Sequence, residues 1–254
     1  MKCPKCEFEQ PDENRECGRC GLIFAKYLKR RTPVPQGQSP SPEEEITVVQ
    51  QGFSIREFLF GVEEDTNPFY FGGRLLLFLL ILVWGLKLIL TPMGGDYKMN
   101  SFMHLINLPF HEAGHIVFRP FGQWITSLGG TLAQLLMPLI CLAVFLLQAR
   151  NTFGASACLW WFGENFMDIA PYINDARALK LPLLGGNVGD RSPYGFHDWE
   201  FILNEIGWLR YDHSLAQTAY KVGAILLLAS LAWGAYLLYR QFRNLDLKSL
   251  RSRP

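Results

Sequence analysis

Two histidines and a glutamate lie within five residues in the segment "HEAGH" at 111–115. Residues i and i+4 lie one turn apart on a helix, so His111 and His115 can direct two imidazoles at one metal ion. Glu112 is rotated from His111 by about 100° and can reach a water on that metal. Zinc lowers the pKa of such a water toward ~7, and a carboxylate can take its proton during attack on a carbonyl. The spacing therefore predicts two zinc ligands and a general base for hydrolysis.

Short patterns of this kind also arise by chance in soluble proteins. The segment 102–118 around this one is otherwise apolar. Ionisable groups in such a segment cost on the order of 2.5–3.5 kcal/mol each to insert into a membrane. Ala113 and Gly114 also leave room beside the histidines and add no charge. These features favour a functional metal site over a chance match.

A catalytic zinc ion usually has three protein ligands and leaves the fourth position to water. The segment 160–177 offers Asp168 and Asp175, which share a helical face with Tyr172. One carboxylate could complete the metal shell, while the other could bind an imidazole N–H in the shell behind it. As an alternative, either aspartate could cap a helix or pair with Arg177 at the membrane boundary.

Two further histidines compete for a place at the metal. His104 lies seven residues before His111 and near the same helix face, and a hydrogen bond at the interface is its simpler role. His197, in "FHDWEF", is followed by Asp198 and could cap the helix that starts there. We therefore expect neither to be a first choice as a ligand.

The N-terminus carries two Cys-x-x-Cys pairs, separated by ten residues and formed by Cys3, Cys6, Cys17 and Cys20. Each pair can supply two thiolates from one tight turn, and four thiolates suit tetrahedral zinc. Two disulfides are the alternative, but the metal-type spacing and the start "MKCPKC", without an apolar signal-peptide core, favour zinc. So small a module needs the metal to fold. We expect a structural zinc ribbon at 1–28, which could also dock a protein partner.

The distribution of hydrophobic residues predicts a membrane protein with several spans. The runs 74–90, 131–149 and 222–239 each approach the ~20 apolar residues with which a helix crosses ~30 Å of hydrocarbon. The segments 102–118 and 152–172 are weaker candidates. We therefore expect an all-α polytopic membrane domain with about four to six transmembrane or re-entrant helices behind the N-terminal zinc ribbon.

The segment 29–51 is rich in proline, serine and charge, which predicts a flexible linker. The membrane domain then occupies 52–254 and begins with an amphipathic segment that we expect at the bilayer surface. The net charge of the chain is +1, so nucleic acid is not an expected partner.

The two ends of the chain are expected on the same side of the membrane. Reduced thiolates for zinc place the ribbon in the cytoplasm. The tail 240–254 carries five lysines and arginines, which favour the cytoplasmic side as well. Five full crossings would separate the two ends. Either one apolar segment must therefore fail to cross, or the segment 196–209 must dip into the membrane.

The segment 102–177 resembles the site-2 protease family of intramembrane zinc metalloproteases. "HEAGH" in an apolar helix, the glycine-containing "SLGGTLAQLLMP" and a later Asn/Asp segment carry this resemblance. It implies a catalytic core of three helices at about 102–177, with His111 and His115 as zinc ligands and Glu112 as the base. The family's distal aspartate precedes a Gly-rich turn, so the resemblance implies Asp175, in "PYINDAR", as the third ligand.

Asp168 and His197 are the alternatives for this third ligand. In the family's distal signature a glycine follows the aspartate, whereas this chain has Ala176. The spacing from Asn165 and Pro171 to the aspartate also differs from that signature.

We therefore expect a zinc endopeptidase of the inner membrane of a prokaryote, with one catalytic and one structural zinc ion. Its substrates would be membrane proteins or peptides in the bilayer, unwound locally to expose the peptide bond. Gly129 and Gly130 are expected to form an irregular segment that lines the cavity or pairs with an extended substrate. The alternative is a non-proteolytic zinc-binding membrane adaptor that docks partners through its ribbon. A closed shell of four protein ligands would favour the adaptor.

Overall fold

The computed structural model divides the chain into two compact units, 1–53 and 54–254. The predicted linker 29–51 lies outside the residues that the structure describes. Those residues are 2–4, 6, 8–9, 11, 14, 16–20, 24, 54–63, 66–93 and 101–245.

The N-terminal unit is organised around its cysteines. The N–H of Cys3 donates to the carbonyl oxygen of Phe8 at 3.0 Å, and an antiparallel bridge joins Lys2 to Glu9. These contacts close the turn that carries the first cysteine pair. Phe24 is buried against the four cysteine side chains. The described core of this unit is therefore one aromatic ring and a group of sulfur atoms, which is too little apolar surface to hold a fold without a cross-link or a metal.

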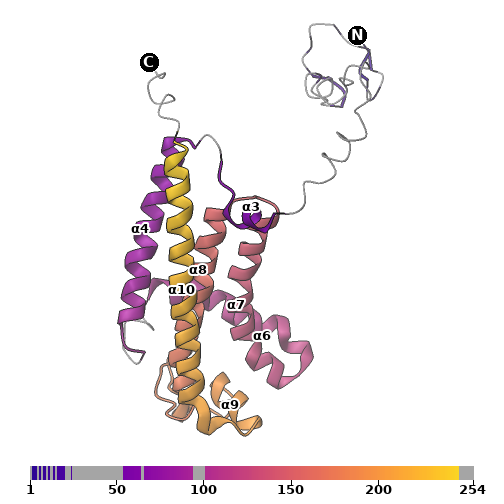
Figure 1. Ribbon diagram of the computed structural model, residues 1–254. Helices are drawn as coiled ribbons and strands as arrows, with labels where there is room; N and C mark the ends of the chain where they lie inside the picture. The colour runs from indigo at the N-terminus through magenta and orange to yellow at the C-terminus, as the bar shows by residue number, and fades with distance from the viewer. Residues whose placement is uncertain are drawn as a thin grey trace, which may run out of the picture. The chain divides into compact units, whose positions relative to one another are not determined.

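The second unit is built from helices (Figure 1). Its described residues show no β-structure beyond isolated bridges, so the predicted all-α fold class is confirmed. The four longest helices lie side by side, and α6 and α9 lie toward the lower end in Figure 1. The α-helices are α3 (Ile55–Phe60), α4 (Pro68–Leu90), α6 (Phe102–Phe118), α7 (Gln123–Leu147), α8 (Thr152–Asn174), α9 (Asp198–Glu205) and α10 (Asp212–Arg243), and the short 3-10 helices are η1 (Arg119–Phe121), η2 (Gly189–Arg191) and η3 (Leu209–Tyr211).

Polar side chains cap the starts of α4, α6 and α8. Asn67, Ser101 and Asn151 precede these helices, and each side chain accepts a backbone N–H from the first turn. Such caps satisfy donors that have no partner within the helix. The starts of these three helices are therefore set locally by the sequence.

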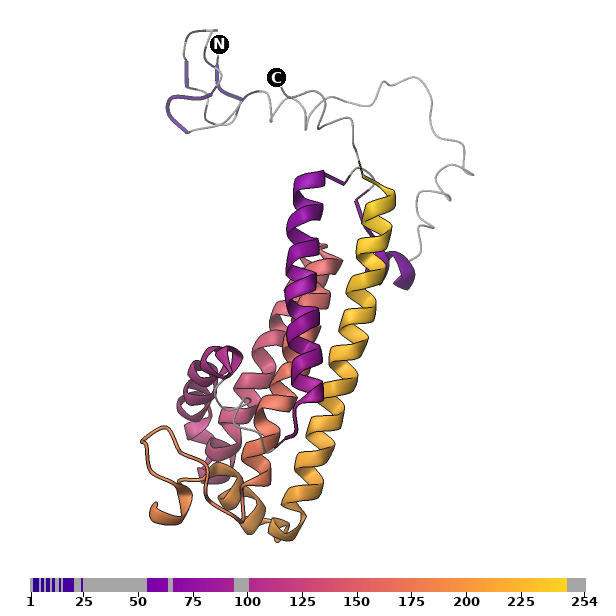
Figure 2. The same ribbon diagram turned by 90° about the vertical axis from the view of Figure 1, so that its left-hand side faces the viewer.

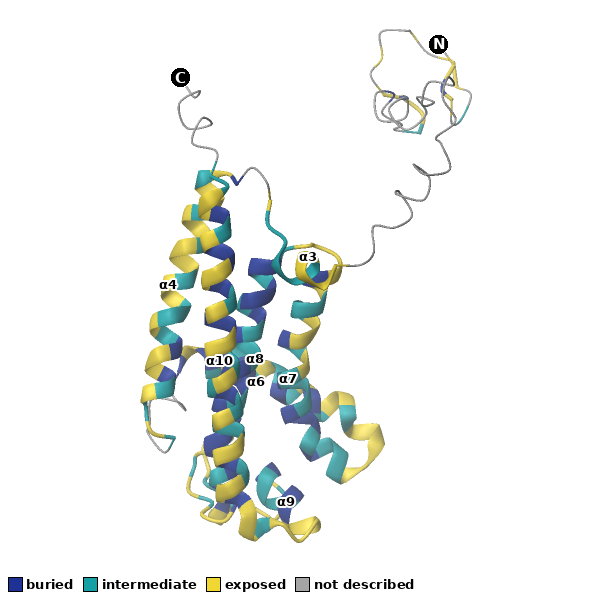
Figure 3. Ribbon diagram, in the orientation of Figure 1, coloured by how far each residue is buried: buried dark blue, intermediate teal, exposed yellow. Residues whose placement is uncertain are grey.

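Three helices are long and apolar enough to cross a membrane: α4, α7 and α10. They correspond to the three strongest apolar runs of the sequence, so that prediction is confirmed. Within α4 only Gly85 and Leu88 are buried, and its leucines are mostly exposed (Figure 3). A helix that is apolar on all sides and exposed within the fold is suited to contact with lipid. The weaker candidates form α6, with 17 residues, and α8, whose buried residues include several polar ones.

The long helices return the chain to the end of the bundle where it enters. The N–H of Thr66, before α4, donates to the carbonyl oxygen of Asn244, after α10, at 2.9 Å. The hydroxyl of Thr152, at the start of α8, donates to the carbonyl oxygen of Gly61 at 2.8 Å. The α7–α8 connection therefore lies at this same end, whereas α6 lies toward the other end (Figure 2). The segment 102–118 is thus the apolar segment that does not run the length of the bundle.

Glycines bring α6 and α7 together. A Cβ added to Gly129 would lie 2.7 Å from Cβ of Phe118 and 2.9 Å from the carbonyl oxygen of Gly114. Gly129 and Gly130 lie inside α7, which is continuous from Gln123 to Leu147. The expectation of an irregular backbone at these glycines is therefore wrong. Small residues in apolar helices allow close helix approach, and that is their role here.

Candidate metal centres

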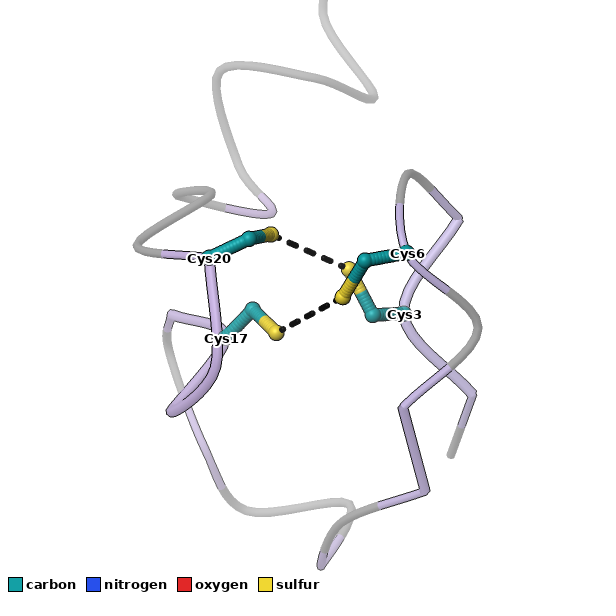
Figure 4. A group of neighbouring side chains, drawn as sticks. All are labelled: Cys3, Cys6, Cys17 and Cys20. Atoms are coloured by element: carbon teal, nitrogen blue, oxygen red, sulfur yellow. Dashed lines mark hydrogen bonds between the residues drawn. The ribbon is translucent and has the colours of Figure 1, made fainter.

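The four N-terminal cysteines form one cluster (Figure 4). Sγ of Cys3 lies 3.7 Å from Sγ of Cys20, and Sγ of Cys6 lies 3.6 Å from Sγ of Cys17. All four sulfur atoms lie within 4.8 Å of one another, and none of the four cysteines is in a disulfide. The cluster could hold a metal ion between the two Cys-x-x-Cys turns.

Backbone donors favour the thiolate form of one of these cysteines. Burial raises the pKa of the Cys17 thiol, but hydrogen bonds from the N–H groups of Cys20 and Arg19 and from neighbouring thiols lower it to about 6. The thiolate is the form that binds metals. Within the hydrogen-bonded pair of Cys6 and Cys17, the thiolate is therefore favoured on Cys17, while the pKa of the Cys6 thiol is raised.

A second group that could hold a metal forms around the histidines of "HEAGH". The rings of His111 and His115 lie on one face of α6, with centroids 4.9 Å apart. Their Nε2 atoms lie 3.3 and 3.4 Å from Oδ2 of Asp198, the first residue of α9. The three donor atoms lie within 4.8 Å of one another. Two ligands thus come from one helix turn and the third from a distant part of the chain.

Asp175, the ligand implied by the resemblance, does not join this group. Its Oδ1 accepts the N–H of Lys180 at 3.0 Å and its Oδ2 accepts the N–H of Leu181 at 2.9 Å. Oδ2 also lies 3.5 Å from Nε2 of His197. The carboxylate therefore holds the turn that follows α8. The structure brings Asp198 to the histidine pair in its place, and the sequence reasoning missed this residue as a ligand.

His197 caps α9, as its position before an acidic helix start predicted. Its Nδ1 accepts the N–H of Glu200 at 3.1 Å, and its ring lies against the ring of Tyr172 with centroids 4.2 Å apart. The capping role leaves the neighbouring Asp198 free to face α6.

Asp168 lies within α8 and binds an imidazole. Its Oδ1 is 2.9 Å from Nδ1 of His104, so the expected hydrogen bond at His104 is present. Asp168 is neither a helix cap nor a partner of Arg177, which pairs instead with Asp212 at 2.7 Å. Asp168 therefore binds a histidine outside the metal group and is not itself a member of that group.

The orientation of His115 is fixed by the backbone of α7. Its Nδ1 lies 2.8 Å from the carbonyl oxygen of Thr126. A carbonyl can only accept, so Nδ1 carries a proton, and Nε2, which faces Asp198, is the ring nitrogen through which His115 could bind a metal. Ligating histidines commonly have such a partner on the second ring nitrogen.

The position of Asp198 is fixed by Tyr172, near the end of α8. The N–H of Asp198 donates to the Tyr172 hydroxyl at 3.1 Å, and that hydroxyl lies 3.4 Å from Oδ2. Burial raises the pKa of the Asp198 carboxyl, but hydrogen bonds with His111 and His115 outweigh burial and hold the pKa below its usual value. The residue is therefore ionised, as a metal ligand must be.

Gly130 keeps the space between the two imidazoles open. A Cβ at this position would lie 2.6 Å from Nε2 of His111 and 2.7 Å from Nε2 of His115. Zinc binds imidazole nitrogens at about 2.0–2.1 Å, so a methyl group here would compete for the place of the ion. The donor set and this gap together fit a metal ion.

The metal group borders a pocket of about 630 Å³. Its polar side includes the group itself together with Glu112, Thr126, Ser127, Gln134 and Tyr172. Its apolar side comprises Leu108, Ile169, Pro182, Leu183, Leu184 and Phe196, from α6, α8 and the loop before α9. The base predicted from "HEAGH" and the three candidate ligands therefore open onto one space.

No family model matches this chain, and neither curated proteins nor solved structures give a match. The similarity to the site-2 protease family therefore rests on the residues of 102–177 themselves.

Proposed function

We propose that the membrane unit is a zinc-dependent protease in which His111, His115 and Asp198 bind the metal and Glu112 is the general base. The observation that carries this proposal is the convergence of three donor atoms beside a pocket that Glu112 also lines. Among the residues described, no further histidine, cysteine or carboxylate joins the group. Three protein ligands are typical of catalytic zinc, whereas structural zinc has four. This favours the enzyme over the adaptor.

The chemistry of this site would divide between the metal and the chain. A bound zinc ion supplies Lewis acidity toward water and toward the scissile carbonyl. The Glu112 carboxylate accepts a proton from the attacking water and returns it to the leaving amine. The peptide bond must reach the pocket in an extended segment, because a helical carbonyl is already hydrogen-bonded. The apolar side of the pocket suits the side chains of a membrane segment.

The cysteine cluster is proposed to hold a second zinc ion with a structural role. Tetrahedral coordination at a Zn–S distance of about 2.3 Å places the sulfur atoms about 3.8 Å apart. The observed separations of 3.6 and 3.7 Å are close to this value. Four thiolates leave no position for a substrate, so this metal would stabilise the ribbon.

The orientation that we propose places both ends of the membrane unit in the cytoplasm. The backbones of Thr66 and Asn244 are hydrogen-bonded, and the five lysines and arginines of 240–254 lie on both sides of Asn244 in the sequence. The metal group lies toward the opposite end of the bundle, with α6 and α9 (Figure 1). Cleavage would therefore take place in the half of the membrane farther from the cytoplasm.

The test is Glu112→Gln in the full chain, reconstituted with a reporter protein that has one membrane-spanning helix. The amide cannot accept the proton, so cleavage should fall by about 10²–10⁴-fold. Zinc content should stay at two ions per chain. Glu57→Gln, in α3, is the matched control and should cleave as the wild type does. Undiminished cleavage by Glu112→Gln would refute the assigned base. A wild-type chain with two zinc ions and no cleavage of any reporter would favour the adaptor.

A further inference from the structure

A buried chain of hydrogen bonds links His111 to a carboxylate that is not one of its metal-site partners. Gln134 of α7 lies between them and is 4% exposed. Its Oε1 lies 3.1 Å from Nδ1 of His111, and its Nε2 donates to Oδ2 of Asp168 at 2.8 Å. Asp168 is itself 6% exposed. The proposed catalytic chemistry uses neither side chain.

The donors around Asp168 determine the role of its Oδ2 atom. The indole N–H of Trp161 donates to Oδ1 of Asn107 at 2.8 Å, and an indole can only donate. The amide nitrogen of Asn107 must therefore face the other way, where it lies 3.0 Å from Oδ2 of Asp168 and 2.9 Å from Oε2 of Glu164. Oδ2 of Asp168 thus accepts a hydrogen bond whose direction is set independently of the metal group.

This acceptor fixes the direction of the next two hydrogen bonds. Because Oδ2 of Asp168 accepts, the end of the Gln134 amide that faces it is the NH₂ group. The amide oxygen must then face His111, and an amide oxygen can only accept. Nδ1 of His111 therefore carries the proton. Its Nε2, which faces Asp198 and the gap at Gly130, is therefore the ring nitrogen that a metal could reach.

We propose that Gln134 and Asp168 are positioning residues that determine which ring nitrogen of His111 is available to the metal. The proposal rests on the proposed metal site. His115 needs no such arrangement, because a main-chain carbonyl cannot turn round. A side-chain amide can, and the carboxylate of Asp168 prevents Gln134 from doing so. The two histidines thus have the same ring orientation, but a backbone carbonyl fixes it in His115 and a side-chain amide fixes it in His111.

Asp168→Leu in the full chain tests this role. Leucine offers Gln134 no acceptor, so Gln134 can reverse and Nδ1 of His111 loses its fixed acceptor. Loss of a partner behind a metal ligand typically weakens metal affinity by about 10–100-fold. Bound zinc per chain is measured over a series of buffered free-zinc concentrations. The ribbon site is the same in every variant, so differences between the titration curves report on the other zinc. We expect the other zinc to bind about 10–100-fold more weakly.

Glu164→Leu is the matched control for this experiment. Glu164 is also a buried carboxylate of α8 and also accepts from Asn107, but among the described residues its carboxylate makes no hydrogen bond with Gln134. This variant should bind both zinc ions as the wild type does. If it weakens the second zinc as much as Asp168→Leu does, loss of any buried carboxylate is sufficient and the proposal is overturned.

Moving the carboxylate to position 134 separates the orientation of His111 from general damage to the fold. In the double variant Gln134→Glu with Asp168→Leu, the carboxylate at position 134 presents an acceptor to Nδ1 of His111 whichever way it turns. The affinity should recover most of what Asp168→Leu loses. Gln134→Leu, which keeps Asp168 and removes the link, should weaken zinc as Asp168→Leu does and serves if that variant does not fold.

Wild-type affinity in Asp168→Leu or in Gln134→Leu, or a double variant no better than Asp168→Leu alone, would overturn the proposal. A wild-type chain that holds only the ribbon metal would overturn this proposal together with the membrane metal site. A wild-type chain that binds both ions but cleaves nothing would refute the protease alone, because the affinities need no substrate.

Discussion

The two metal groups of this chain are assembled over different distances along the sequence. The cysteine cluster takes all its members from 3–20, with two from each tight turn. The membrane group takes two from a single turn of α6, and the third, Asp198, arrives from α9 after two long helices. A local sequence motif therefore supplies every member of the cysteine cluster. It supplies only two members of the membrane group, and the tertiary fold brings in the third.

The two groups also differ in how far the surrounding protein holds their side chains in place. The ribbon has one buried aromatic residue in its described core, so its fold depends on what the sulfur atoms bind. In the membrane unit, the positions of the ligands are already held by Thr126, Gln134 and Tyr172, and Gly130 leaves the space between them. We expect metal loss to unfold the ribbon and to leave the membrane helices folded.

The largest expected effect separates the ligand from the residue that the resemblance implied. Asp198→Ala should lower zinc from two ions per chain to one and abolish cleavage, because it removes one of three donors. Asp175→Ala should keep both ions. It should instead lower the free energy of unfolding by about 1–3 kcal/mol, because the N–H groups of Lys180 and Leu181 lose their acceptor. Zinc content and thermal unfolding of both variants distinguish the two residues. Loss of zinc from Asp175→Ala alone would return the assignment to Asp175.

Gly130→Ala should also remove one zinc ion without removing any ligand. The added methyl group would lie within 2.7 Å of both Nε2 atoms, so the rings must turn away from their common point. Gly72→Ala is the matched control, because a Cβ at Gly72 in α4 meets nothing within 4 Å. Zinc content of the two variants decides the point. Two ions bound to Gly130→Ala would show that the metal does not lie between the imidazoles.

The sequence predicted the parts of this molecule that depend on local spacing. A continuous apolar run of about 20 residues has few explanations other than a membrane helix, and three such runs are α4, α7 and α10. The i, i+4 spacing likewise brought His111 and His115 onto one helix face. In both cases the periodicity of one helix is enough to place the residues relative to each other.

Asp198 could not be placed in this way, because its position depends on how the connection after α8 folds back. That fold depends on a turn in which the N–H of Leu183 donates to the carbonyl oxygen of Asn187 at 2.7 Å, and on the contact of Tyr172 with His197. The sequence did contain a signal for Asp198 in the pair "HD" at the start of α9. A helix start needs only one capping side chain, so with His197 as the cap the Asp198 carboxylate remains available as a ligand. Gly129 and Gly130 were misassigned for a related reason: a glycine in an apolar segment fits a packed helix as well as an irregular one.

The ribbon variant Cys17→Ser with Cys20→Ser tests whether the two groups are independent. It removes two of four thiolates, so zinc should fall from two ions per chain to one. Cleavage of a reporter helix should keep its wild-type rate if the units act separately. A fall in cleavage together with the loss of ribbon zinc would mean that the ribbon takes part in substrate delivery or in the fold of the membrane unit.

The smallest expected effect concerns Tyr172, which holds the distant ligand in place. Tyr172→Phe removes the acceptor for the N–H of Asp198 and the hydroxyl near its Oδ2, while the ring contact with His197 stays. A hydrogen bond of this kind contributes about 0.5–1.5 kcal/mol, so the affinity of the membrane zinc should fall by about 2- to 10-fold. Tyr220→Phe is the matched control, since that hydroxyl donates to the carbonyl oxygen of Ile89 at 2.7 Å. It should lower stability by a similar amount and leave zinc affinity unchanged. Equal zinc affinities in the two variants would mean that α9 holds Asp198 in position without help from Tyr172 of α8.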